Sequence, residues 1–295
     1  MKALVSIITV NYNGLRDTCE MIDSFRSRET YPRYEIIVVD NGSRLPEAEE
    51  IQERYRDNPV PGGSLSGSPV SFPPVKVVRN INNGFAGGNN AGLKAAAGDY
   101  LFFINNDTLI KEPVLDALVR RVESDSPRNG GVSPMLKFAA CPDTLQYAGF
   151  TPLSPVTLRN AAIGFMQQDS PRFRIPRETA SLHGAAMMVS RRALQDAGTM
   201  SEVYFLFYEE LDWSAQLRKA GYRLWYEPAA VVYHKEGMTA RRGSPTREFY
   251  LSRAYLCILA APKKAAVYLL HGQVALAKAT ICGTCEGIYK NIRTA

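Results

Sequence analysis

The first hundred residues of the chain repeat one pattern, in which short apolar segments alternate with longer amphipathic ones. The apolar segments are residues 4–10, 34–39, 75–78 and 100–104. Apolar residues recur with helical spacing over residues 15–27, and a second helix is expected over residues 86–97. Continuous apolar runs are typical of strands that are buried on both faces of a sheet. The alternation therefore predicts an α/β fold with a mostly parallel sheet, covered by helices and joined by right-handed crossovers.

Polar side chains follow each of the four predicted strands, at the point where the strand ends. They are Thr9 and Asn11, then Asp40, then residues 82–84, and finally residues 105–107. In open parallel sheets the ligand lies outside the carboxyl ends of the strands. Four separate strand ends thus predict one ligand site along this edge of the sheet.

The length and composition of the chain are those of an ordinary globular protein. Its 295 residues are enough for one large domain with an appendage, and 22% charged residues leave enough apolar residues for a core. No apolar run approaches the ~18 residues that a membrane span needs. The amino-terminal apolar stretch is short, lacks a small-residue cleavage site and is interrupted by residues 11–13. We therefore expect a cytoplasmic protein.

The remaining regions are less regular. Residues 58–74 are rich in proline, glycine and serine, which predicts a surface insertion without regular structure. Residues 124–180 contain many prolines and show no clear periodicity. The elements expected after this region are residues 184–189, a helix over residues 209–220, and two short strands over residues 223–226 and 230–233.

Two segments suit the binding of a nucleotide. Asp40 ends a buried strand, where a carboxylate accepts hydrogen bonds from ribose hydroxyls or base N–H groups; an Asx-turn explains it equally well. The glycine-rich residues 82–90 open a helix, whose backbone and amino terminus favour a diphosphate. This loop is neither a Walker loop nor a dinucleotide fingerprint, because it lacks GK[ST] and has a different glycine spacing.

Asp107 and His234 are candidate ligands of a divalent cation. Asp107 follows the fourth strand, where a carboxylate that faces a diphosphate holds a cation with few protein ligands. The alternatives are a cap for the helix that begins near Pro113, or an Asx-turn. His234 closes the strand over residues 230–233, and imidazole joins carboxylate and phosphate oxygens around Mn-type ions. A lone histidine is, however, more often structural.

Glu209, Glu210 and Asp212 begin a predicted helix. Acidic residues in a first turn are favoured by the helix dipole, which is the structural explanation. Successive helical residues are turned by about 100°, so Glu209 and Asp212 share a face while Glu210 projects elsewhere. One of these acids can therefore reach a substrate while the others remain structural.

Seven segments in this order resemble glycosyltransferase family 2, and they are most similar to its rhamnosyltransferase-like branch of bacterial polysaccharide synthesis. The resemblance covers roughly residues 4–260 without the proline-rich insertion. The segments are VSIITVNYNG, EIIVVDNGS, NNGFAGGNNAGL, DYLFFINNDTLI, HGAAMMVSRRAL, YFLFYEELDWSAQLRKAGYRLWYEPAAVVYHKEG and FYLSRAYL. The resemblance implies the glycosyltransferase A-type fold, with a Rossmann-like sheet. It also implies a nucleotide-sugar-binding catalytic domain of residues 1–240 and a helical extension of residues 241–295.

The resemblance also implies a role for each site residue. Glu210 would be the general base, while Asp107 and His234 would hold a divalent cation, Mn or Mg. The donor-binding residues would be Thr9, Asn11, Asp40, Asn83, Gly84, Asn105, Asn106 and Arg253. Asn105 stands where the family has its first metal aspartate, and Glu210 stands where it has an aspartate base. An amide oxygen coordinates hard cations and glutamate is a competent base, so both changes are compatible with the chemistry.

The implied activity is transfer of a sugar with inversion from a nucleotide-diphosphate donor to a hydroxyl of a cell-surface glycan or lipid-linked acceptor. Rhamnose from dTDP-rhamnose is the donor that the branch implies, and a UDP-hexose is the alternative. A non-catalytic nucleotide-sugar-binding scaffold is the alternative class. A nucleotidyltransferase is disfavoured because no basic glycine-rich loop follows the first strand, and an oxidoreductase because the dinucleotide fingerprint is missing.

Positive charge gathers in the extension, within a net charge of +6 and a pI near 9.0. No recognition-helix pattern accompanies it, so nucleic acid is not expected as a partner. Two hypotheses remain open for the extension. It lies peripherally on the inner membrane, where lipid-linked acceptors are built, or it packs on the catalytic domain or on a second copy in a homo-oligomer. The basic residues are Arg241, Arg242, Arg247, Arg253, Lys263, Lys264, Lys278, Lys290 and Arg293.

Overall fold

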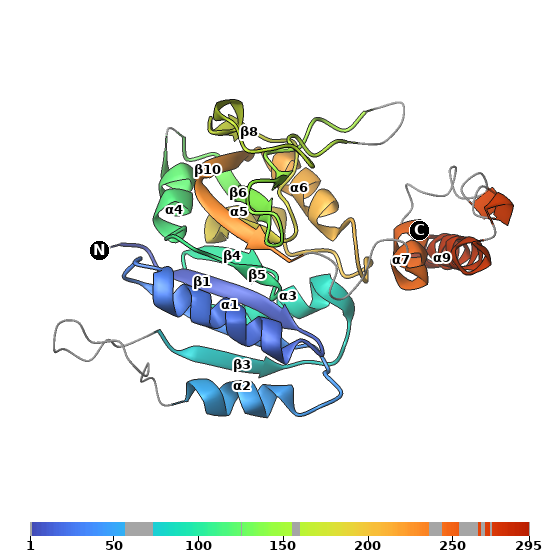
Figure 1. Ribbon diagram of the computed structural model, residues 1–295, viewed down its shortest axis with the longest axis horizontal. Helices are drawn as coiled ribbons and strands as arrows, with labels where there is room; N and C mark the ends of the chain where they lie inside the picture. Colours follow the sequence, from blue (N-terminus) through green and yellow to red (C-terminus); the bar gives the residue numbers. More distant parts are fainter. Residues whose placement is uncertain are drawn as a thin grey trace.

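A computed structural model describes most of the chain as one central sheet with helices on both sides and two further helices beside it (Figure 1). The insertion predicted over residues 58–74 lies, except for its last two residues, outside the described part. The described residues are 2–56, 73–124, 126–154, 160–235, 244–253, 265–266, 269–271 and 273–294.

Ten strands of the described chain form the sheet. They are β1 (Val5–Asn11), β2 (Tyr34–Asp40), β3 (Val75–Arg79), β4 (Tyr100–Ile104), β5 (Thr108–Leu109), β6 (Asn129–Phe138), β7 (Leu145–Tyr147), β8 (Arg177–Glu178), β9 (Ala186–Ser190) and β10 (Arg223–His234). Their order is β3-β2-β1-β4-β9-β6-β10-β5, with β7 beside β6 and β8 beside β10. Strands β1 to β4, β6 and β10 run in one direction and the others oppose them. The predicted mostly parallel α/β sheet is confirmed.

Most helices of the described chain cover the two faces of this sheet in two groups, and the last two lie beside it. The helices are α1 (Leu15–Arg28), α2 (Glu47–Tyr55), α3 (Gly84–Ala95), α4 (Leu115–Glu123), α5 (Arg191–Ala197), α6 (Glu209–Lys219), α7 (Pro245–Arg253) and α9 (Val274–Thr294), with one short 3-10 turn, η1 (Pro171–Phe173). Side chains from α1, α2 and α4 form one core cluster, which includes Ile7 of β1. Side chains from α3, α5 and α6 form the other, which includes Ile8. Both faces of β1, β2 and β4 are buried, which explains why these strands read as continuous apolar runs.

One expectation about the later strands is wrong. Residues 223–226 and 230–233 belong to one strand, β10, and not to two. The register against β6 shifts between Glu227 and Val231, so a bulge carries the strand past Pro228, which cannot donate a ladder hydrogen bond. Strand β6 lies within residues 124–180, where the sequence shows no clear periodicity and predicts no strand, and it is buried along almost its whole length.

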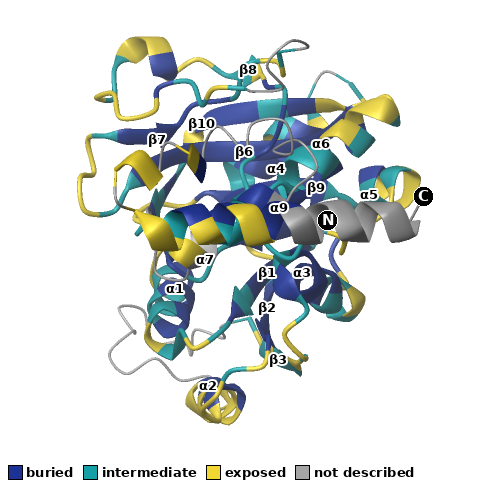
Figure 2. Cartoon of the chain, turned by 90° about the vertical axis from the view of Figure 1, so that its right-hand side faces the viewer, coloured by how far each residue is buried: buried dark blue, intermediate teal, exposed yellow. Residues whose placement is uncertain are grey.

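The helical tail is confirmed in α7 and α9, which pack on one another beside the sheet (Figures 1 and 2). A Cβ at Gly283 of α9 would come within 2.0 Å of the Phe249 carbonyl oxygen, so the two helices cross at close range. The ring of Tyr250 on α7 stacks on Phe205 at 4.8 Å between centroids. The predicted boundary between residues 240 and 241 lies outside the described residues. Within the described chain, no helix is both long and apolar enough to span a bilayer.

Candidate active site

The sheet brings Asn11 and Asp40 side by side, because β1 and β2 pair in register at these two residues. Nδ2 of Asn11 donates to Oδ1 of Asp40 at 3.2 Å and to Oε2 of Glu47 at 2.8 Å. Oδ1 of Asn11 accepts from the Thr18 hydroxyl at 2.7 Å. The Asn11 amide is therefore fully engaged inside the protein, where it holds Asp40 in place.

Asp40 is only 8% exposed, and its two carboxylate oxygens differ in their surroundings. Oδ1 accepts from the Ser43 backbone N–H and hydroxyl, so the Asx-turn hypothesis holds for this atom. Oδ2 accepts no hydrogen bond from the residues that the structure describes, and it is available to a ligand. Thr9 is fully buried in β1, and its Oγ1 likewise lacks a partner within the described chain.

The turn of residues 82–84, here called the 82–84 turn, leads into α3, and the backbone of Phe205 packs against it. Gly84 has φ +89°, and a Cβ there would lie 2.3 Å from the Phe205 carbonyl oxygen. The same oxygen accepts from the Phe85 N–H at 2.8 Å. Asn83 lies at the start of α3, and its Oδ1 accepts from Asn80 at 2.8 Å. Only glycine combines this backbone conformation with this close approach.

Asp107 and His234 meet at the other end of the site. His234 lies opposite Thr108 in the β5–β10 pairing, which places its Nε2 3.0 Å from Oδ1 of Asp107. Nδ1 of His234 lies 2.9 Å from Oε1 of Gln146, a buried residue of β7. With the carbonyl of Gln146 as acceptor, Nδ1 carries a hydrogen and Nε2 faces Asp107. A hydrogen bond of this kind at the second nitrogen is typical of a metal-binding histidine.

The Asp107–His234 pair fits a divalent cation. Adjacent ligands about 2.1 Å from an octahedral ion lie about 3 Å apart, which is the separation observed here. In addition, the buried Oδ1 of Asn105 accepts no hydrogen bond from the described residues and keeps its lone pairs for another partner. No group of three potential His, Cys, Asp or Glu ligands occurs among the described residues. A cation here would therefore need further oxygen ligands, such as those of a diphosphate.

The neighbouring Asn106 has a different surrounding. Its Nδ2 donates to the Thr18 hydroxyl at 3.0 Å, which ties the turn after β4 to α1. The helix-cap hypothesis for Asp107 does not hold, because Oε2 of Glu29 accepts the N–H groups of Val114 and Leu115 at the start of α4. Asp107 is thus left to its contact with His234.

The entrance to α6 is strained. Phe207 and Tyr208 both have positive φ angles, 71° and 74°, in the left-handed region that residues other than glycine seldom adopt. Directly afterwards, Glu209 is buried at 4% exposure, and its Oε2 has no partner in the described chain. Desolvation and the adjacent Glu210 raise the pKa of Glu209 well above the ordinary value.

Glu210 is half-buried and lies against the backbone of Gly184, where an added Cβ would be 3.6 Å from its carboxyl carbon. Desolvation raises the pKa of Glu210, and backbone hydrogen bonds partly offset the rise. The predicted divergence of the two acids is therefore seen as a buried Glu209 beside a partly accessible Glu210. A glutamate with a raised pKa suits general acid–base chemistry.

His183 was not singled out from the sequence, yet it lies in this region. Its ring stacks on Phe150 at 5.8 Å and meets the edge of Tyr147 at 5.1 Å. Nδ1 accepts the Ala185 N–H at 3.1 Å, so the ring hydrogen belongs to Nε2. Desolvation, with a smaller contribution from His234, lowers the pKa of His183 to about 3, and the ring is neutral. These contacts are long-range and leave no mark in the local sequence.

Lys235 is a second residue that the sequence did not single out. It follows His234, and its Nζ forms ion pairs with Asp17 and Glu20 of α1. Burial alone would lower the pKa of Lys235, but the two carboxylates outweigh it and raise the pKa. The ion pairs fix the end of β10 against α1. Arg253, predicted to bind the donor, is the last residue of α7, and its side chain lies outside the described part.

A family model described as glycosyl transferase family 2 matches residues 6–197, which is more than half of the chain. The chain belongs to glycosyl transferase family 2. Among curated relatives, it is 24% identical over 250 residues to the O-antigen biosynthesis protein RfbC of Myxococcus xanthus, covering 79% of this chain and 17% of that protein. It is also 24% identical over 270 residues to the pre-mycofactocin glycosyltransferase of Mycobacterium tuberculosis (strain CDC 1551 / Oshkosh), covering 90% and 49%. The chain thus spans half or less of these relatives.

Solved structures confirm the glycosyltransferase A-type fold of this family 2 chain. GalNAc-T7 with UDP, GalNAc and Mn²⁺ superposes with a TM-score of 0.62 at 17% identity, covering 85% of this chain and 47% of that one. The mannosyltransferase PcManGT from Pyrobaculum calidifontis, in complex with GDP-Man and Mn²⁺, gives 0.56 at 17% identity, covering 98% and 74%.

Proposed function

We propose that this chain is an inverting, divalent-cation-dependent glycosyltransferase that moves rhamnose from dTDP-rhamnose to a hydroxyl of a bacterial cell-surface glycan or lipid-linked acceptor. The observation that carries the proposal is the 3.0 Å approach of Asp107 to His234 at the same sheet edge as Asp40 and the 82–84 turn. Asp40 would bind the nucleoside through its free Oδ2, and the amino terminus of α3 would face the diphosphate.

Glu210 would act as the general base. It would take the proton of the acceptor hydroxyl, whose oxygen attacks the anomeric carbon on the face opposite the nucleotide. The bond from the anomeric carbon to the acceptor oxygen forms as the bond to the diphosphate breaks, and the nucleoside diphosphate leaves. A cation held by Asp107 and His234 would offset the charge that develops on the diphosphate. A single displacement inverts the anomeric centre, and the burial of Glu209 supports a single acting carboxylate.

The comparisons support the cation and the class of product. The similar structures contain Mn²⁺ together with UDP or GDP-Man, and one relative is named for O-antigen biosynthesis. The rhamnose donor rests on the resemblance of the sequence motifs to the rhamnosyltransferase-like branch. A UDP-hexose is the alternative donor, which the presence of UDP in GalNAc-T7 favours.

Calorimetric titration tests the proposal. Thymidine, uridine and guanosine diphosphates would be added in turn, each with and without Mn²⁺. We expect tight binding of the thymidine nucleotide only with Mn²⁺. Preference for the uridine nucleotide would replace rhamnose by the UDP-hexose alternative, and tight binding without metal would remove the cation. Binding of a donor sugar without any transfer or hydrolysis would favour the scaffold alternative.

The extension of residues 241–295 would form a part separate from the catalytic domain and would contact the inner membrane or a second copy of the chain. Sedimentation with vesicles that contain anionic lipid, compared with neutral vesicles, tests the membrane contact, since a basic amphipathic surface should bind only the anionic ones.

A further inference from the structure

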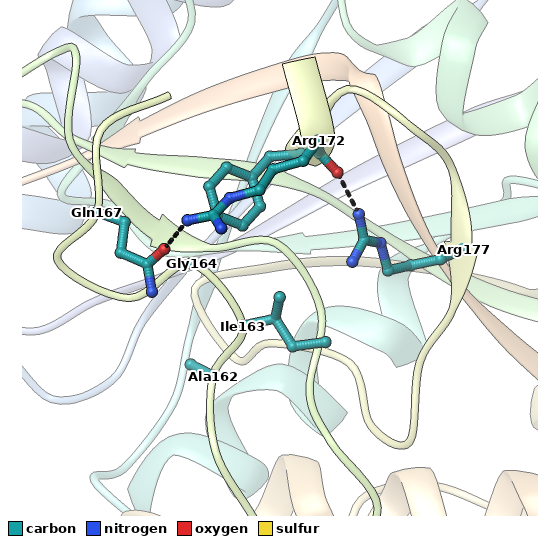
Figure 3. A pocket seen from close by; sticks show the side chains of 7 residues that line it. Ala162, Ile163, Gly164, Gln167, Arg172 and Arg177 are labelled. Carbon is teal, nitrogen blue, oxygen red and sulfur yellow. Dashed lines mark hydrogen bonds between the residues drawn. The ribbon is translucent and has the colours of Figure 1, made fainter. Parts of the chain in front are cut away.

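A pocket of about 360 Å³ lies away from the Asp107–His234 pair, in the region of residues 162–177 (Figure 3). This volume is at the lower end of the range of small-molecule sites, which is about 300–1,000 Å³. Arg172 and Arg177 approach it from two sides, while Ile163 and Phe173 supply apolar wall. A pocket with two cations and an apolar wall suits a ligand that is charged at one end and has C–H groups elsewhere.

The two guanidinium groups have no counter-ion within the described chain. Neighbouring basic side chains do: Lys137 and Arg174 share Asp169, and Arg223 pairs with Glu178. Arg172 and Arg177 bond instead to neutral oxygens, at 2.5 Å to Oε1 of Gln167 and at 2.7 Å to the Arg172 carbonyl. Each bond uses one of the five N–H groups of its arginine, so several donors remain.

Both arginines are also held in place by aromatic rings. The Arg172 guanidinium lies 4.7 Å from the centroid of Phe173, and that of Arg177 lies 5.8 Å from the centroid of Tyr226. Because these contacts limit the freedom of the side chains, less conformational entropy is lost when a ligand binds. The positive charge is thus pre-arranged and unneutralised at one pocket.

The pocket is connected to the candidate active site through a two-stranded ribbon. Leu145 donates its N–H to Gln167 and Ala148 donates to Ile163, at 2.8 and 2.9 Å. Between them, Gln146 contacts His234, and beyond them Phe150 stacks on His183. One segment therefore contacts the pocket and the reacting region, as expected for a site that binds a remote part of a long acceptor.

We propose that this pocket binds an oxyanion carried on a sugar ring of the acceptor glycan, either a carboxylate or a phosphate. Arg172 and Arg177 would pair with the oxyanion, and Ile163 and Phe173 would contact the C–H face of the ring. The assignment to the acceptor rests on the proposed function; the binding of an anionic sugar does not.

The test is a calorimetric or NMR titration of the full chain, saturated with nucleoside diphosphate and Mn²⁺ so that the donor site is occupied. Methyl glucuronide carries the carboxylate, glucose 6-phosphate carries the phosphate, and methyl glucoside is the neutral control. We expect millimolar binding of at least one anionic sugar and none of the neutral one. The stronger of the two anionic probes identifies the source of the oxyanion.

Substitutions of the two arginines test whether the anionic sugar binds at this pocket. Arg177→Gln and Arg172→Gln should each weaken the binding of that sugar about tenfold, since a charge-assisted pair is lost. Arg177→Lys should recover part of it, because the charge returns without the fork of donors. Arg223→Gln removes the same charge from the adjacent β10 and should leave binding within about twofold. Equal binding of the neutral sugar, unchanged binding in both glutamine variants, or no binding of either anion would overturn the proposal.

Nucleotide binding by the same variants separates the two proposals. Arg172→Gln and Arg177→Gln should bind nucleoside diphosphate as the unsubstituted chain does, and their thermal unfolding should confirm that they fold. If the unsubstituted chain bound no nucleotide, the proposed function would fail. The sugar titration, repeated without nucleotide, would still decide the pocket.

Discussion

Nε2 of His234 lies 3.0 Å from Oδ1 of Asp107, and the backbone of the two segments holds them at that separation. His234 pairs with Thr108 across β5 and β10, and the Lys235 N–H donates to the Asp107 carbonyl at 2.9 Å. On its other side, the imidazole is oriented by the buried Gln146. The pair is thus positioned by a sheet and by a buried amide, as a prepared ligand site requires.

Substitution of Asp107, or of Gln146, which orients His234, should weaken the binding of a divalent cation. Asp107→Asn should lower the apparent affinity for Mn²⁺, measured by calorimetry with nucleoside diphosphate present, by at least about tenfold. Gln146→Leu, which keeps the volume but not the hydrogen bond, should lower it by about 10–100-fold. Asp116→Asn removes a carboxylate from a surface ion pair with Lys2 and serves as the control. Unchanged Mn²⁺ affinity in Asp107→Asn would exclude Asp107 as a ligand.

Glu210→Gln should lose about 10²–10⁴ in kcat while it still binds nucleotide, because only the transfer of the acceptor proton is lost. Asp212→Asn is the matched control: it lies in the same first turn, and its carboxylate bonds to Gln216. Initial-rate measurements of sugar transfer distinguish the two variants. Comparable losses in both would indicate that helix stability, and not proton transfer, is affected.

The activity should depend on pH through the Glu209–Glu210 pair. Desolvation raises the pKa of Glu210 from its ordinary value of 4.5, and a base must be ionised to act. The profile of kcat/KM should therefore fall on the acid side with an apparent pKa above 4.5 that belongs to the pair. Residual activity of Glu210→Gln should lack this fall. If the fall in kcat/KM at acid pH persisted unchanged in Glu210→Gln, the titration of another group would be its cause.

Glu209→Gln should stabilise the fold increasingly as the pH rises. Desolvation and Glu210 raise the pKa of Glu209 in the folded state above the value of 4.5 in the unfolded chain. The protonated Glu209 therefore contributes fully to the free energy of unfolding below about pH 4.5, and this contribution is lost as the pH rises through the folded-state pKa. The glutamine amide of the variant does not ionise, so the variant avoids this loss of stability. The loss is worth about 1.4 kcal/mol for each unit by which the pKa of Glu209 is raised on folding. Urea unfolding at pH 4.5 and pH 8 measures it. The prediction fails if the difference between variant and parent is equal at both pH values.

Two glycines separate backbone strain from steric contact. Gly84 and Gly198 have φ angles of +89° and +84°, so alanine is strained at either position. A Cβ at residue 198 meets nothing within 4 Å, whereas one at residue 84 lies 2.3 Å from the Phe205 carbonyl oxygen. Gly198→Ala should cost about 1–3 kcal/mol, because its ψ of −179° together with the positive φ is a conformation essentially restricted to glycine. Gly84→Ala should cost more and also weaken nucleotide binding. If urea unfolding showed that the two substitutions lower the free energy of unfolding equally, the Phe205 backbone would have to move away from residue 84 without an energetic cost.

Strands β1, β2 and β4 could be predicted from the sequence because both faces of each are buried. Strand β3 lies at the edge of the sheet and has no buried residue, and the valines at residues 75, 77 and 78 marked it. Ile7 and Ile8 of β1 enter opposite core clusters, so a continuous apolar run marks the strand. β6 could not be predicted in this way. It contains Gly130 and Gly131, a proline at residue 134 opposite the bulge of β10, and Lys137, which is buried against Asp169. Their compatibility with a central strand depends on partners that are distant in sequence.

The residues of the candidate site likewise differ in whether the local sequence could indicate them. Asp40, Asp107 and Glu210 were predictable because each lies directly at the end of a strand or the start of a helix. Gln146 and His183 could not be predicted, since their importance comes from contacts with His234, Phe150 and Tyr147 that form only in the fold. Asn11 shows the reverse case. Its position indicated a ligand contact, but its hydrogen bonds are used within the protein.

The Phe205 carbonyl covers Gly84 and accepts the Phe85 N–H, and three residues later the chain turns into α6 and reaches Glu210. Main-chain contacts therefore set the distance between the 82–84 turn and the start of α6. If Glu210 acts as the base that we propose, side chains around a bound sugar can be substituted without moving the start of α6 relative to the 82–84 turn. A change of donor sugar would then require side-chain substitutions only, because the main-chain arrangement stays the same.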